Sequence, residues 1–207
     1  TATTLIELAC ETDFVAKSEK FIALGNTVLQ ALADSGAETV EAALAVKVGS
    51  GTVESTISDE AAILGEKIEL RRLARIPGNK FAVYLHRTSK DLPPQVGVVV
   101  AFEGDDAETI RSVAQHISFA DPQYLTRDEV PADIVENERR IVEEISRGEG
   151  KPEAALPKII EGRVNGFFKE QVLLEQPFAK EPKKTVAKVL DEVGASATGF
   201  ARFRVGS

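Results

Sequence analysis

The sequence has little of several residue types that mark particular classes of protein. Cys10 is its only cysteine. No internal disulfide can therefore form, which is typical of a protein kept in a reducing cytoplasm. Methionine is absent altogether, even from position 1. We therefore expect a trimmed or processed fragment, with further sequence upstream of Thr1.

Long apolar runs and an excess of positive charge are also absent. The longest apolar run, at residues 96–102, is far too short to cross a bilayer, and no signal segment opens the chain. The formal net charge is −8. Because a nucleic-acid-binding surface needs clustered positive charge, we expect no direct nucleic-acid partner. We expect no membrane partner either.

What is present is an ordinary globular composition, with 43% apolar and 28% charged residues in a chain of 207. This length suits one large domain or two small ones. Apolar periodicity in the first half predicts, in order, a strand at 5–10, a helix at 14–34, a short helix at 39–45, a helix at 58–75 and a strand at 81–86.

A similar order of elements follows a linker with two prolines at residues 89–95. The second half is predicted to contain a strand at 96–102, a helix at 107–119, a helix at 186–193 and a strand at 198–205. This repetition predicts an α+β fold of two related subdomains, each a small antiparallel sheet packed by helices.

The second half is interrupted by a segment of different character. Within it, two stretches with apolar stripes at helical spacing are separated by "GEGKP", which ends one helix before the next begins. We expect an antiparallel helical hairpin, resembling a coiled coil, inserted at 131–169. The core would then consist of an N-terminal subdomain at 1–95 and a C-terminal subdomain at 96–130 and 170–207.

Several residues could carry chemistry, but each also has a structural explanation. Glu11 and Asp13 could form a carboxylate pair for acid–base catalysis or metal binding. Two acids in a turn are more often a helix cap and a solvated neighbour. Neither His86 nor His116 has partners at the spacing of a zinc site, so we expect no metal. Cys10, within an apolar strand, is expected to be a small buried hydrophobe.

Phe14 poses a question of its own. Helical spacing aligns it with Phe21 and Val28, which predicts a position in the core. However, it lies in the first turn of the expected helix, where a side chain can overhang the end of a sheet and remain available to a partner. The sequence leaves both alternatives open.

Several motifs in register resemble one known family. They are "ETDFVAK" at 11–17, "GEKIELRR" at 65–72, "RDEVPADIVENE" at 127–138, "GKPE" at 150–153, "KIIEGR" at 158–163, "LLEQPF" at 173–178, "KKTV" at 183–186 and "GFARFRVG" at 199–206. Together they resemble the bacterial elongation factor Ts family, the guanine-nucleotide exchange factors for elongation factor Tu. The family's small N-terminal helical domain has no counterpart in this chain.

The resemblance implies a cytoplasmic exchange factor that uses no cofactor and performs no covalent chemistry. Its partner would be elongation factor Tu, whose magnesium and phosphate site it would disturb. The contact residues carried over are Thr12, Asp13, Phe14 and Val15, and, with less support, His116. A homodimer or a 2:2 complex, with the hairpin as a contact, is compatible with the family. Two other hypotheses stay open, an enzyme using the two acids near Phe14 and a passive assembly module built on the hairpin.

Overall fold

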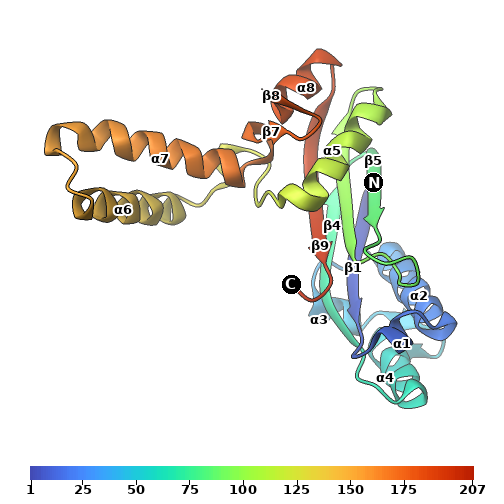
Figure 1. Cartoon of the computed structure of the whole chain (residues 1–207). Helices are drawn as coiled ribbons and strands as arrows, with labels where there is room; N and C mark the ends of the chain where they lie inside the picture. Colours follow the sequence, from blue (N-terminus) through green and yellow to red (C-terminus); the bar gives the residue numbers. More distant parts are fainter.

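The computed structural model describes all 207 residues, and it has an α+β fold in which two antiparallel sheets lie against each other (Figure 1). The first sheet pairs β1 (Ala2–Ala9) with β4 (Glu69–Pro77). The second has the strand order β5 (Lys80–His86), β6 (Val96–Glu103) and β9 (Ser196–Arg204). Strands β1 and β4 contact β6 and β9, so the two sheets share an interface.

Helices cover both sheets and account for two of the three apolar cores. The first core joins the β1–β4 sheet to α2 (Glu19–Ser35), α3 (Val40–Leu44) and α4 (Val53–Leu64). The second joins the β5–β6–β9 sheet to α5 (Ala107–Ala120) and α8 (Val186–Glu192). Two minor strand pairs complete these units, β2 (Lys47–Val48) with β3 (Gly51–Thr52) and β7 (Pro177–Phe178) with β8 (Glu181–Thr185).

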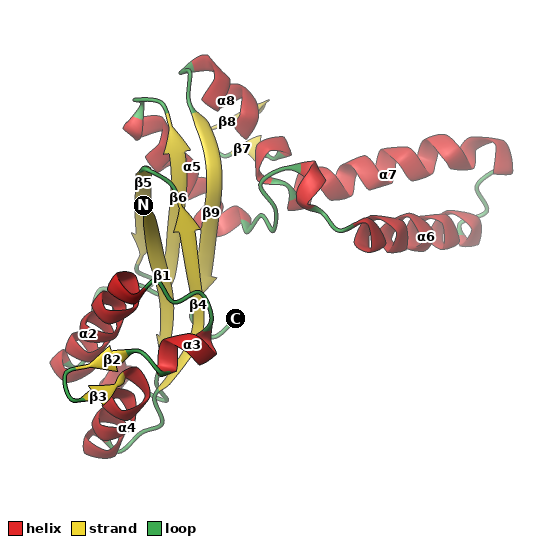
Figure 2. Cartoon of the chain, turned by 180° about the vertical axis from the view of Figure 1, so that it is seen from behind, coloured by secondary structure: helices red, strands yellow, loops and turns green.

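The third core lies apart from the sheets. Helices α6 (Ala132–Gly148) and α7 (Leu156–Gln171) pack on each other and project sideways from the rest of the chain (Figures 1 and 2). Buried side chains between and at the base of these helices form their own cluster: Val130, Val142, Leu156, Ile160, Val164, Phe168 and Val172. None of the helices in the fold combines the length and apolarity that a bilayer crossing requires.

Close approach of the two sheets depends on glycine. A Cβ at Gly97 would lie 3.0 Å from Cδ1 of Leu5, and a Cβ at Gly199 would lie 3.3 Å from Cγ2 of Ile76. Both contacts are tighter than side chains normally accept. Because glycine has no side chain, the second sheet can pack closely against the apolar residues of the first.

The predicted helix at 14–34 is wrong as a single element, because the chain breaks at Ser18. Residues Asp13–Ala16 form α1, Lys17 closes it, and Ser18 has extended backbone angles. The Ser18 hydroxyl then accepts a hydrogen bond from the Phe21 backbone at 3.2 Å and starts α2 as its N-cap. The break takes Phe14 off the buried face that Phe21 and Val28 share.

The predicted helix at 58–75 is also wrong. A capping box between Thr52 and Ser55 starts α4 earlier, and Gly65, in the left-handed conformation at φ 75°, ends it. The residues that follow form β4, in which Leu70 is buried and the backbone pairs with β1. The arginine and leucine residues of this stretch recur at a spacing that is also compatible with a helix, although the stretch forms a strand.

Strand β5 belongs to the second sheet, although the sequence placed residues 81–86 in the first half. All seven residues of β5 pair with β6 across the proline-containing linker, in a register that joins Lys80 to Phe102 and His86 to Val96. The linker therefore connects neighbouring antiparallel strands.

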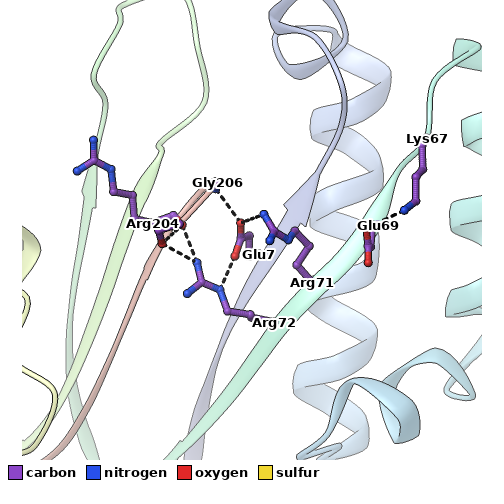
Figure 3. Close-up of polar contacts among 8 residues, drawn as sticks. Glu7, Lys67, Glu69, Arg71, Arg72, Arg204 and Gly206 are labelled. Carbon is purple, nitrogen blue, oxygen red and sulfur yellow. Dashed lines mark hydrogen bonds and ion pairs between the residues drawn. The ribbon is translucent and has the colours of Figure 1, made fainter.

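A buried carboxylate ties the C-terminal tail to the first sheet (Figure 3). Glu7 on β1 is fully buried and pairs with Arg72 on β4, while its other oxygen accepts the backbone N–H of Gly206 at 3.1 Å. The guanidinium of Arg71 lies 3.7 Å from Oε1 of the same carboxylate. Arg72 also donates to the Arg204 carbonyl at 2.6 Å, so one arginine bridges β1 and the end of β9.

Candidate partner-binding site

The ETDF segment forms a short helix at the end of β1. Thr12 is the N-cap of α1, and its hydroxyl accepts from the Val15 backbone at 3.4 Å. Asp13 occupies the first turn, where a negative charge is favoured by the helix dipole. The helix is only four residues long and has no buried residue, so it forms an exposed tip between β1 and α2 (Figure 1).

Phe14 projects from this tip into solvent. Its exposed fraction is 78%, higher than that of any other large exposed apolar residue of the chain. The ammonium of Lys17 lies over the ring, 5.0 Å from its centroid. The core placement suggested by helical spacing is therefore wrong, and the ring is available for contact with another molecule.

Val15 anchors the tip on its inner side. It is half-buried and packs against the core formed by α2, α3, α4 and the first sheet. Thr12 and Asp13 are exposed. The four residues of the signature thus consist of one apolar anchor and three exposed residues.

A pair of glutamates joins the tip to the segment after α4. Glu66 accepts hydrogen bonds from the backbone N–H groups of Glu11 and Thr12, both at 3.0 Å, and from the Thr12 hydroxyl. Glu11 in turn accepts the backbone N–H of Lys67 at 2.9 Å. The Thr12 hydroxyl, followed by the two backbone donors, holds the pKa of Glu66 below its usual value.

Glu11 therefore has a structural role as the acceptor of the Lys67 backbone N–H. Nowhere in the chain do three or more His, Cys, Asp or Glu side chains gather as metal ligands would. Cys10 is half-buried, and burial together with the nearby charge of Glu66 raises the pKa of its thiol. A raised thiol pKa opposes nucleophilic use.

A small cavity of about 130 Å³ lies behind the tip. It is lined by the end of β1, by α1, by linker residues 92–95 and by Val205 near the C-terminus. The tip therefore borders segments from three distant parts of the sequence, including the tail that Glu7 holds.

His116 does not join the residues of the tip, because it belongs to α5. Helix α5 lies far from α1 in the fold (Figure 1). His116 is 3% exposed. Its Nδ1 accepts from the Ala179 backbone at 3.2 Å, and its Nε2 lies 2.8 Å from Oε1 of Gln176. This pattern fits a neutral imidazole that donates from Nε2. Burial lowers the pKa of His116, which also favours the neutral form.

The exposed side chain beside His116 is Phe119, one turn further along α5. Its exposed fraction is 68%, and its ring packs edge-on against the imidazole with the centroids 5.7 Å apart. Phe119 is not among the contact residues predicted from the sequence. Its position beyond the apolar stripe of Ile110, Val113 and Ile117 was the available signal.

Comparisons with known proteins agree on one family. The family model described as elongation factor TS matches residues 11–207. The chain is 66% identical over 204 residues to the elongation factor Ts of Leifsonia xyli, covering 99% of this chain and 74% of that protein. It is 66% identical over 206 residues to the protein of the same name from Clavibacter michiganensis, covering 100% and 75%. The Micrococcus luteus protein is 56% identical over 206 residues, covering 98% and 74%.

Proposed function

Because the chain belongs to the elongation factor Ts family and is a translation elongation factor, we propose that it binds elongation factor Tu and promotes the release of GDP from it. In this role it is a binding catalyst that forms and breaks no covalent bond. The observation that carries the proposal is the 78% exposure of Phe14, within the motif that resembles the family signature.

An exposed phenyl ring at the tip of a small helix is costly in water and gains free energy when a partner covers it. Full burial of such a side chain contributes about 1.5–3 kcal/mol. Asp13 and Lys17 flank the ring on the same short helix and its C-cap. A matching surface on the partner would be an apolar gap bordered by polar groups that receive these two charges.

The exchange mechanism follows from how phosphate-loop proteins hold nucleotides. Backbone N–H groups, a lysine and Mg²⁺ bind the phosphates of GDP in the partner. Phe14 enters between partner helices near the magnesium site and displaces them, while Asp13 fixes the direction of approach. The magnesium and phosphate geometry is then lost, and no group of this chain needs to touch GDP.

Thermodynamic linkage makes the effect reciprocal. The exchange factor and GDP favour different conformations of the same partner, so each weakens the binding of the other by the same factor. GTP binding then releases the exchange factor, and the cycle can repeat. We infer that the exposed Phe119, supported by buried His116, provides a second apolar contact on the C-terminal subdomain.

A second candidate function is passive assembly through the α6–α7 pair. Ile134 and Ile145 on α6 are 38% and 48% exposed, which favours an additional protein contact there. Such a contact could serve a homodimer, a 2:2 complex or a further contact with elongation factor Tu. An assembly module without exchange activity would leave the nucleotide kinetics of its partner unchanged.

The test is the release of a fluorescent GDP analogue from a bacterial elongation factor Tu, with and without the chain. We expect sub-stoichiometric amounts to accelerate release. An unchanged rate in the presence of saturating, folded chain would contradict the proposed function.

A further inference from the structure

We propose that Glu66 is a positioning residue for nucleotide exchange, because its carboxylate holds the α1 tip in the geometry that presents Asp13 and Phe14 to the partner. The inference rests on the proposed function and assigns a role to a residue outside the ETDF signature. The Glu66 carboxylate is bonded to the backbone of the tip, so the proposed role needs no contact between Glu66 and the partner.

Helix α1 cannot hold its own position. It has four residues, and isolated helices of this length are unstable because nucleation is costly. None of its residues is buried, and Val15 is the member that packs against the first core. Contacts from outside the helix must therefore fix its direction.

Glu66 supplies these contacts through both carboxylate oxygens. Its Oε2 accepts the backbone N–H groups of Glu11 and Thr12, each at 3.0 Å, and its Oε1 accepts the Thr12 hydroxyl. The same hydroxyl accepts the backbone N–H of Val15 at 3.4 Å. Glu66 therefore orients the hydroxyl that caps α1, and it also holds the two residues that lead into the helix.

The segment that carries Glu66 is also held by the tip. The carboxylate of Glu11 accepts the backbone N–H of Lys67 at 2.9 Å, so the two loops are bound at two points. Gly65, with φ 75°, ends α4 directly before Glu66 and turns the chain toward the tip. Carboxylates suit this arrangement because they only accept hydrogen bonds and have enough lone pairs for three donors.

Two substitutions of Glu66 distinguish the effect of its hydrogen bonds from the effect of its negative charge. Glu66→Ala removes both acceptor oxygens and the three hydrogen bonds they accept, so the tip gains conformational freedom that must be lost again on binding. We expect GDP release to slow about tenfold. Glu66→Gln keeps an amide oxygen for the two backbone donors and an NH₂ group that can donate to the Thr12 hydroxyl. We expect it to stay within about threefold of the unmodified chain.

Glu69→Ala is the matched control. Its side chain is 53% exposed and forms an ion pair with the Lys67 side chain at 3.2 Å (Figure 3). The backbone N–H groups of Glu11 and Thr12 donate to Glu66 and not to Glu69. Exposed pairs of this kind contribute little, so GDP release and stability should both remain close to those of the unmodified chain.

The decisive measurement is a double-mutant cycle with Phe14→Ala, because it distinguishes positioning from a general structural role. If Glu66 acts by positioning Phe14, adding Glu66→Ala to the Phe14→Ala chain should slow GDP release by less than about twofold. Equal slowing by Glu66→Ala in both backgrounds would overturn the inference, and so would unchanged release in the single variant.

Amide hydrogen exchange measured by NMR tests the same contact without elongation factor Tu. The amides of Glu11 and Thr12 should exchange about tenfold faster in Glu66→Ala, while amides of β4 remain unchanged. Unaltered protection of both amides would overturn the inference. If the unmodified chain fails to accelerate GDP release, the proposed function fails, and this measurement still decides whether Glu66 holds the tip.

Discussion

The backbone N–H of Gly206 donates to the buried carboxylate of Glu7 at 3.1 Å, although the two residues are 199 positions apart along the chain. The contact brings the C-terminal tail against β1, the strand that leads into the α1 tip. Arg72 completes the arrangement by pairing with Glu7 and donating to the Arg204 carbonyl. The two sheets are thus held together by a polar network as well as by apolar packing.

Removal of the Glu7 carboxylate should destabilise the fold. In Glu7→Ala, Arg72 loses its ionic partner and Gly206 loses its acceptor. Breaking a fully buried pair costs about 3–5 kcal/mol. Because Arg72 is 34% exposed and can reach water, we expect a smaller loss of about 2–3 kcal/mol in the free energy of unfolding. Urea unfolding measures it, with Glu69→Ala as the control that should change it by less than about 0.5 kcal/mol.

The buried imidazole of His116 should make stability depend on pH. Burial lowers the pKa of His116 in the folded protein below the ordinary value of 6.5. Between these two pKa values, the imidazole is protonated in the unfolded chain and remains neutral in the folded chain. Its contribution to stability is fully present above pH 6.5 and decreases as the pH falls toward the folded pKa. Urea unfolding from pH 7.5 to 5 should show this loss.

The control for this pH dependence is His116→Gln, which cannot titrate. Its unfolding free energy should be lower at pH 7.5, because the hydrogen bond with Gln176 and the packing on Phe178 are altered. However, it should decline less on acidification than that of the unmodified chain. Parallel declines in the two proteins would assign the pH dependence to other groups.

The α6–α7 pair should be removable without loss of the core. Its buried side chains form a cluster separate from those of the two sheets. Replacement of residues 131–168 by a short Gly/Ser loop should therefore leave one cooperative thermal transition, detected by calorimetry. Loss of cooperative melting would show that the pair stabilises the core.

The sequence predicted the elements that depend on local signals. The strand at the start of the chain, the strand at 96–102 and the helix at 107–119 are close to β1, β6 and α5. Apolar patterns over five or more residues were sufficient to predict these elements. The predicted α+β class is confirmed by the two antiparallel sheets and their covering helices.

The errors arose where a local pattern was ambiguous or a partner was distant. The Ser18 N-cap interrupts a stretch whose spacing is continuous, and Gly65 separates α4 from a strand that also fits a helical pattern. The contacts of Glu66 with Thr12 and of Glu7 with Gly206 join residues 54 and 199 positions apart. No periodicity reports such pairs, which is why these two glutamates were not singled out.

If exposed Phe14 acts on the partner, Phe14→Ala should impair exchange and leave the fold intact. Denaturant unfolding and fluorescent-GDP release from elongation factor Tu should be measured on the same variant, with Val83→Ala, another exposed apolar residue, as the control. Because the ring is already exposed, the free energy of unfolding should fall by less than about 1 kcal/mol. Loss of the buried ring in the complex should slow GDP release about ten- to a hundredfold. A large loss of stability with unchanged release per folded molecule would show that Phe14 belongs to the core and does not act on the partner.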